Sequence, residues 1–247
     1  MISQKNGAYD AWHRMQAEKE DALGGAGDHL WHQMVRRRLG SISQLRVAEV
    51  GCGRGDFAIF LAREGAEVVA LDASREALEL GKERARERGV DVQFILGNAE
   101  ETGLASSAFD LVISCECLEH VDSPRRMATE LHRICKPGGR CIITTPSYLN
   151  AELLSWAVAL LRRKQYSHQP RDNFFLFFRV KRMLQKAGFS VIDTDSRYFR
   201  FLLLPRVDPD RLRVLEFESS MLNRLFRPFG LHFLFDLEKP RIGQPPM

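Results

Sequence analysis

The 247-residue sequence lacks the features that mark several large classes of protein. No apolar run approaches the roughly 20 residues that a membrane-spanning helix needs. There is no internal repeat or low-complexity segment, and the first 30 residues contain no apolar secretory segment. The net charge of +4 comes from interspersed basic and acidic residues, which gives no electrostatic argument for DNA binding. We therefore expect a globular cytoplasmic protein that does not bind DNA.

Cysteine is also scarce, and its distribution argues against disulfide bonds. The five cysteines are odd in number, and most of them lie within apolar runs. Thiols in such positions are typical of reduced, buried cysteines in a cytoplasmic protein. The spacing of Cys115 and Cys117 is too short for a zinc knuckle. An apolar content of 45% is normal for a protein with a full hydrophobic core.

The most informative stretch joins a short apolar run to a glycine turn. Residues 46–50 form an apolar run bounded by glycine, which predicts a buried parallel strand. Apolar residues then recur at helical spacing from Phe57 to Leu61, which predicts a helix. Between them lie three alternate glycines, Gly51, Gly53 and Gly55. We expect these glycines to let the backbone turn sharply and approach a ligand closely.

An acid before the glycines narrows the choice of ligand. The dinucleotide fingerprint is G-x-G-x-x-G and binds an anionic pyrophosphate. This chain has G-x-G-x-G, with Glu49 two residues before the first glycine. A carboxylate there would repel a phosphate and suit an ammonium or a sulfonium group. No Lys-Ser or Lys-Thr pair follows, which excludes a P-loop, and a tight turn without a ligand is the alternative.

Further apolar runs predict the rest of an alternating core. Strands are expected at 67–72, 92–96, 109–114 and 140–145, with helices that begin near Ser74 and at Pro124. The strand at 67–72 ends in Asp72, some twenty residues beyond the glycine turn. Ligands bind outside the carboxyl ends of the strands in such sheets. Asp72 is therefore expected to accept hydrogen bonds from two ribose hydroxyls, with a turn cap as the weaker alternative.

This order of elements, from Arg46 to Pro146, resembles the class I S-adenosylmethionine-dependent methyltransferases, whose motif I the glycine stretch matches. The resemblance implies a Rossmann-like, doubly wound α/β fold with seven strands in the order 3-2-1-4-5-7-6, strand 7 being antiparallel. Residues 190–194 and 231–237 would be the sixth and seventh strands. It also implies one domain over residues 1–247, made of a helical lid (1–40), a cofactor-binding core (46–146) and a substrate side with apolar insertions (147–247). Plain packing of residues 1–40 is the alternative to a mobile lid.

The resemblance further implies that the cofactor is S-adenosyl-L-methionine (SAM). Its implied binding residues are Glu49, Gly51, Cys52, Gly53, Gly55, Asp72, Ala73, Asn98, Ala99, Cys115 and Glu116. The family usually has Asp where this chain has Asn98, whose amide carbonyl still offers an acceptor for the adenine amino group. His120 is the candidate catalytic base, and a hydrogen-bonded histidine at a helix start is the alternative.

The pattern Glu116-x-x-Glu119-His120 raises the question of a metal. In a helix, donors at i, i+3 and i+4 can converge on one divalent ion. The pattern resembles the metal sites of quinone-biosynthesis O-methyltransferases and of small-RNA 3′-end 2′-O-methyltransferases. The latter family has a further histidine in an Asp-His pair, where this chain has Asp172-Asn173. We therefore expect no metal site.

The resemblance implies methylation, with a small, largely apolar or lipid-like acceptor and O-methylation as the leading hypothesis. The apolar stretches Ala151–Arg163 and Tyr198–Leu204 are expected to line the acceptor pocket, with burial in the core as the alternative. Basic residues beside them would allow peripheral contact with a membrane. Methylation of an RNA 3′ end and a non-catalytic SAM-binding role are the two alternatives.

Overall fold

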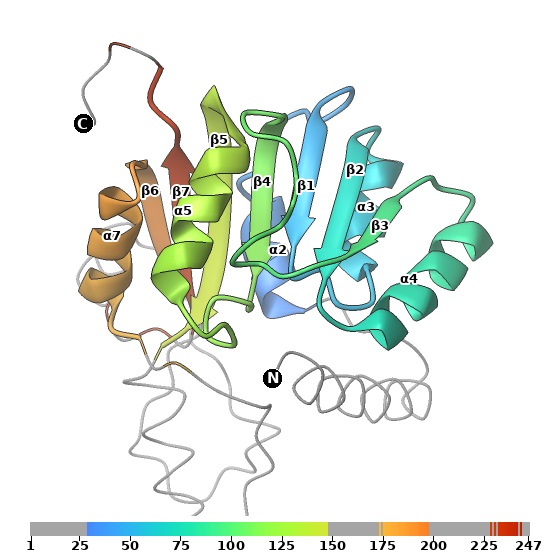
Figure 1. Ribbon diagram of the computed structural model, residues 1–247, viewed down its shortest axis with the longest axis horizontal. Helices are drawn as coiled ribbons and strands as arrows, with labels where there is room; N and C mark the ends of the chain where they lie inside the picture. The colour runs from blue at the N-terminus through green and yellow to red at the C-terminus, as the bar shows by residue number, and fades with distance from the viewer. Residues whose placement is uncertain are drawn as a thin grey trace, which may run out of the picture.

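The computed structural model describes residues 29–147, 173, 175–197, 228, 230, 232–241 and 243. They form a seven-stranded sheet flanked by helices (Figure 1), in the order β3-β2-β1-β4-β5-β7-β6. The strands are β1 (Arg46–Val50), β2 (Glu67–Asp72), β3 (Gln93–Leu96), β4 (Phe109–Cys115), β5 (Cys135–Pro146), β6 (Ser190–Arg197) and β7 (His232–Glu238). The helices are α2 (Leu30–Arg36), α3 (Asp56–Arg63), α4 (Arg75–Glu87), α5 (Pro124–Ile134) and α7 (Phe177–Lys186). Strand β7 runs antiparallel to β5 and β6, so the predicted fold class, strand order and direction are confirmed.

Alternation along the strands divides the core into two layers. Val47 and Ile113 belong to the layer that α2, α3 and α4 cover. Their neighbours in sequence, Ala48 and Val112, belong to the layer under α5 and α7. This separation follows from the period of two residues in a strand, whose side chains point alternately to opposite faces. In Figure 1, α5 and α7 lie in front of the sheet, while α2 and α3 lie behind it.

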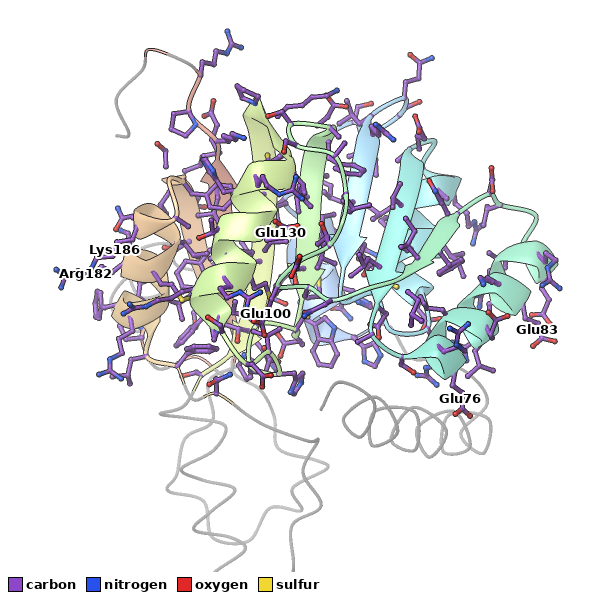
Figure 2. All side chains as sticks on the ribbon, viewed as in Figure 1. Glu76, Glu83, Glu100, Glu130, Arg182 and Lys186 are labelled. Carbon is purple, nitrogen blue, oxygen red and sulfur yellow. The ribbon has the colours of Figure 1, made fainter. Side chains whose placement is uncertain are left out.

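Helix α7 shows how one helix separates apolar from charged side chains. Val180 and Leu184 are buried in the layer that α7 shares with α5. Figure 2 shows Arg182 and Lys186 extending from α7 away from the sheet. The apolar residues recur at i and i+4, which places them on one side of the helix. Helix α7 thus packs its apolar side against the core and exposes its charged side to solvent.

Strand β5 begins earlier than the sequence predicts. Helix α5 ends at Ile134, and β5 begins at the next residue rather than at Arg140. Cys135 pairs with Phe109 and Arg140 pairs with Leu111, so residues 136–139 bulge out of the register. A Lys-Pro-Gly-Gly sequence is typical of a loop, and here the loop interrupts a strand.

Helix α2 packs onto the sheet. Met34 and Val35 are buried in the same layer as α3. Just beyond α2, Arg38 forms ion pairs with Asp193 and Asp195 of β6, and its carbonyl accepts a hydrogen bond from Arg140. This part of the predicted lid region thus belongs to the body of the domain. A lid formed by earlier residues stays a prediction, because Tyr9, Trp12 and Met15 lie outside the described residues.

Two further predictions also fall outside the described residues. These are the apolar stretches Ala151–Arg163 and Tyr198–Leu204, which were expected to line the acceptor pocket. Within the described part of the chain, no helix is both long enough and apolar enough to cross a bilayer.

Candidate active site

The predicted site residues come together at the carboxyl edge of the parallel strands. Strands β1, β2 and β4 all end at the lower edge of the sheet in Figure 1. The glycine loop follows β1, Asp72 ends β2, and Glu116 follows β4. In open α/β sheets this edge, where the strand order reverses, is the usual place for a ligand.

The glycine loop turns sharply through left-handed backbone conformations, as its composition predicts. Two of its glycines are also required by contacts with neighbouring side chains. Gly51, Gly53 and Gly55 all have positive φ values, 80°, 51° and 70°. A Cβ on Gly55 would lie 2.6 Å from the Phe94 ring, and one on Gly51 would clash with the Cys117 side chain. The expectation that all three glycines are there for ligand approach is therefore incomplete. Gly51 and Gly55 are also needed because neighbouring side chains fill the space beside them.

Asp72 holds the loop in place. Its Oδ2 accepts a hydrogen bond of 2.7 Å from the Gly53 N–H, and its Oδ1 accepts one of 2.9 Å from the Ser74 N–H. The turn-capping alternative is therefore observed. It does not exclude the ribose role, because each carboxylate oxygen keeps a second lone pair for a hydroxyl donor. The next residue but one, Ser74, caps α4 by accepting from the Ala77 N–H.

Glu49 is a buried acid that lies near two other acids, Asp56 and Asp72. Only 2% of the residue is exposed. Burial raises the pKa of Glu49 well above its ordinary value, the charges of Asp56 and Asp72 raise it further, and the Ala58 N–H acts in the opposite direction. Its Oε2 has no hydrogen-bond partner among the described residues. Burying such an oxygen is costly, and a cationic group of a ligand would offset that cost.

Asn98 and Ala99 follow β3 in a turn, in which Asn98 is exposed and Ala99 is buried. The Asn98 Oδ1 accepts a hydrogen bond from the Glu100 N–H at 2.9 Å, which is a local turn contact. One lone pair of the amide oxygen remains for a donor such as an adenine amino group. The Glu100 carboxylate in turn accepts from the Asp122 and Ser123 N–H groups just before α5, and Figure 2 shows Glu100 near that end of the helix.

The cysteines near the site are unreactive thiols. Cys52 and Cys115 are buried, and burial raises the pKa of each thiol well above its ordinary value. Burial also raises the pKa of Cys117. All five cysteines are free thiols in the structure, with four buried and Cys117 half-buried. Since a thiol reacts as the thiolate, the raised pKa values argue against a nucleophilic role for these three cysteines.

The segment after β4 forms a turn rather than the helix that metal binding would require. Glu116, Glu119 and His120 lie in bends and turns, so the i, i+3, i+4 alignment is lost. The described residues contain no group of three His, Cys, Asp or Glu side chains that could hold a metal ion. Asn173, at the position of the expected downstream histidine, donates to the backbone carbonyls of Glu119 and Val121. Its side chain braces the turn.

Glu119 and His120 are neighbours in this turn. Glu119 is 3% exposed and its Oε2 accepts a hydrogen bond of 2.9 Å from the Thr145 hydroxyl. Burial, reinforced by the charge of Glu116, raises the pKa of Glu119 to about 8. The His120 Nε2 lies 3.6 Å from the other carboxyl oxygen. His120, predicted as the base, thus lies beside a buried acid whose pKa is raised above its ordinary value.

His232 also belongs to this cluster, although no pattern in the sequence indicates it. Its Nδ1 lies 2.9 Å from Glu116 Oε2, although 116 residues separate the two in sequence. His232 is the first residue of β7 and pairs with Pro146, the last residue of β5. The antiparallel direction of β7 thus brings its first residue to the carboxyl edge. Trp31 of α2 lies beside it, with the ring centroids 5.5 Å apart.

Comparison with known proteins agrees with this geometry. Residues 48–143 match the family model described as a methyltransferase domain. Residues 48–143 form a class I methyltransferase domain. The match spans β1 to β5 and includes the glycine loop, Asp72 and the turn with Glu116. Such a domain implies SAM as its cofactor, and the unpartnered oxygen of Glu49 fits the cationic end of that molecule.

Two curated relatives of the methyltransferase domain are ubiquinone biosynthesis O-methyltransferases. The one from Cronobacter sakazakii is 34% identical over 128 residues, which is 51% of each chain. The one from Pectobacterium atrosepticum is 35% identical over 138 residues, which is 53% of this chain and 56% of the relative. The chain thus aligns with about half the length of these relatives.

Solved structures extend the likeness of the fold to nearly the whole chain. The [4+2]-cyclase SpnF has a TM-score of 0.68 at 17% identity, covering 96% of this chain and 97% of its own. A SAM-dependent methyltransferase from Thermotoga maritima has a TM-score of 0.66 at 19% identity, covering 95% and 99%. Since one neighbour is described as a cyclase, the fold of the methyltransferase domain does not by itself define the reaction.

Proposed function

We propose that this chain is a SAM-dependent methyltransferase that methylates a hydroxyl group of a small, largely apolar acceptor. The observation that supports this most is the pairing of two features at the carboxyl edge. One is the buried Glu49 oxygen that lacks a partner. The other is the glycine loop held by Asp72.

Different residues of this chain would bind different parts of SAM. Glu49 and the glycine loop would hold the methionine part, Asp72 the ribose, and Asn98 with Ala99 the adenine. The full proposed set is Glu49, Gly51, Cys52, Gly53, Gly55, Asp72, Ala73, Asn98, Ala99, Cys115 and Glu116. When bound, SAM supplies a methyl group activated on a sulfonium, so its departure needs no acid. The protein's contribution is then alignment, exclusion of water and acceptance of a proton from the acceptor.

The acceptor class is proposed from the relatives and from the site. Two relatives of the domain are O-methyltransferases of ubiquinone biosynthesis, which favours a hydroxyl on a ring with apolar substituents. The described rim of the site offers an indole ring, Trp31, beside His232. Aromatic walls with few polar groups are typical of sites for small apolar ligands.

The test is the release of S-adenosylhomocysteine from SAM in the presence of different acceptors. We expect release with catechol and faster release with 4-tert-butylcatechol, because the added apolar group binds the pocket. A short RNA with a free 3′ end serves as the acceptor of the alternative hypothesis. Release with the RNA alone would replace this proposal by the RNA hypothesis. SAM binding without release from any acceptor would favour the non-catalytic role.

A further inference from the structure

The pair formed by Glu116 and His232 has a geometry that suits proton transfer. The Glu116 Oε2 to His232 Nδ1 distance is 2.9 Å. A carboxylate can only accept a hydrogen bond, so the hydrogen of this contact belongs on Nδ1. The neutral imidazole then has its lone pair on Nε2, where it can accept a hydrogen bond. The side chains are 16% and 15% exposed for His232 and Glu116, so they are sheltered but reachable.

Glu116 also has an unusual backbone conformation. Its φ is 50°, in the left-handed region that non-glycine residues rarely adopt. The Glu116 N–H donates to the Thr144 carbonyl at 3.1 Å, which helps to hold this conformation. Its second carboxylate oxygen, Oε1, is buried and has no partner among the described residues. Strained backbone that is held by its surroundings is concentrated at functional sites.

The surroundings of His232 come from four elements. Trp31 of α2 lies with its ring centroid 5.5 Å from the His232 ring and itself stacks on His29 at 4.5 Å. The turn after β4 contributes the carboxylate of Glu116. Glu119 and His120, 3.6 Å apart, follow in the same turn. On the sheet, His232 pairs through its backbone with Pro146 of β5 and Arg197 of β6.

We infer that His232, oriented by Glu116, is the group that accepts the proton of the acceptor hydroxyl, an inference that rests on the proposed function. The acceptor oxygen forms its bond to the methyl carbon as the S–CH3 bond breaks, and the electron pair of the broken bond stays on sulfur. The hydroxyl proton passes to His232 Nε2. The resulting imidazolium is stabilised by the Glu116 carboxylate until it releases the proton to water. His232 is thus the catalytic residue and Glu116 its positioning residue.

The first experiment compares His232→Gln with the unchanged protein, using catechol as the acceptor. Glutamine keeps a polar side chain but does not accept a proton. We expect turnover to fall about 100-fold or more, the lower end of what a general base contributes. The rise of the rate with pH should also disappear. The matched control is His132→Gln, at the far end of α5, which should keep the parent rate and pH profile.

A second variant covers the case in which His232→Gln does not fold. Glu116→Gln keeps the size of the side chain and leaves the imidazole in place, and should lower turnover about tenfold or more. His120→Gln should have a smaller effect than His232→Gln. If His120→Gln abolishes the pH dependence while His232→Gln retains it, His120 is the base and the inference is wrong.

A third readout does not depend on turnover. In protein labelled with 15N-histidine and saturated with S-adenosylhomocysteine, added catechol should shift the Nε2 signal of His232 but not the signals of His132. An unchanged His232 signal at saturating catechol contradicts the inference. Calorimetry with S-adenosylhomocysteine distinguishes a failure of the proposed function from a failure of the inference about His232. No binding to the parent protein refutes the proposed function, whereas normal binding with parent-like turnover in His232→Gln refutes this inference alone.

Discussion

Asp72, Glu49 and Glu119 are all acids at the carboxyl edge of the sheet, yet their surroundings differ. Asp72 accepts two backbone hydrogen bonds and joins the glycine loop to the turn after β2. Glu49 is buried with one oxygen unpartnered among the described residues. Glu119 is buried beside Thr145, with a pKa of about 8. We expect Asp72 to contact the ribose and Glu49 to contact the cationic end of the cofactor. We expect Glu119 to stabilise the turn after β4 in its protonated form.

Replacement of Asp72 by alanine should weaken SAM binding by about 1–3 kcal/mol, the loss expected for hydrogen bonds to a charged group. The change removes the acceptor for ribose and the contact that holds the Gly53 N–H. Isothermal calorimetry measures the effect. Asp110→Asn is the matched control, because this carboxylate pairs with Lys136 away from the site. Equal affinities for Asp72→Ala and the parent would remove Asp72 from the cofactor site.

Glu119→Gln should flatten the pH dependence of stability. The pKa of Glu119 is about 8 in the folded chain against an ordinary 4.5, so the folded state keeps a proton that the unfolded state loses between these pH values. The free energy of unfolding should therefore fall as the pH rises from about 4.5 to about 8. Urea unfolding across this range measures the slope, which the glutamine variant should reduce.

Glu130 is the control for this prediction, because its pKa is shifted in the opposite direction from that of Glu119. Hydrogen bonds from Arg133 lower the pKa of Glu130 to about 2. Its stabilising contribution is present above about 4.5 and is lost as the pH falls towards 2. Glu130→Gln should thus change stability at neutral pH and leave the slope between pH 5 and 8 as in the parent. The same slope change in both variants would contradict the assignment.

At the level of elements, the glycine loop and the turn after β4 define the site. The loop is fixed by Asp72 and by bonds from the Gly51 and Cys52 N–H groups to the Leu71 carbonyl. The turn is fixed by Asn173 and by the register of β5 with β4. Both elements therefore depend on neighbours that are distant in sequence.

Gly55→Ala should destabilise the fold by about 2 kcal/mol or more. About 1–2 kcal/mol is expected from the left-handed backbone, where φ is 70°. The new Cβ would also lie 2.6 Å from the Phe94 ring. Gly89→Ala isolates the backbone cost, because its φ is 64° and nothing lies within 4 Å of an added Cβ. Thermal unfolding should show the larger loss for Gly55→Ala, and equal losses would contradict the packing argument.

Turnover should be independent of added metal. The turn with Glu116, Glu119 and His120 is not helical, and Asn173 hydrogen bonds to the backbone where a histidine ligand was considered. We expect the rate with catechol to change less than about twofold on addition of a chelator. A loss of more than tenfold that magnesium or manganese restores would show that these side chains bind a metal after all.

At the scale of the whole molecule, the sequence predicts the strands and helices well because each has a clear local period. The runs that end in Gly51 and Asp72 are observed as β1 and β2. The sheet order came from the resemblance, since local patterns do not specify which strands pair. The early start of β5 was missed because a Pro-Gly-Gly loop within a strand has the same composition as a loop between elements.

The contact between Glu116 and His232 cannot be predicted from any local pattern in the sequence. It depends on the antiparallel register of β7, in which His232 pairs with Pro146. A shift of one residue would move the His232 side chain to the other face of the sheet. For the same reason, no local pattern indicates that Gly51 and Gly55 are needed beside Cys117 and Phe94.

The most direct test of the central claim is a calorimetric titration of the whole chain with SAM, and with NAD as the competing ligand. We expect saturable binding of one SAM per chain at submillimolar concentration, weakened in Asp72→Ala, and no binding of NAD. The reason is that Glu49 suits a cation and would repel a pyrophosphate. Absence of SAM binding at millimolar concentration, or binding of NAD in its place, would contradict the account.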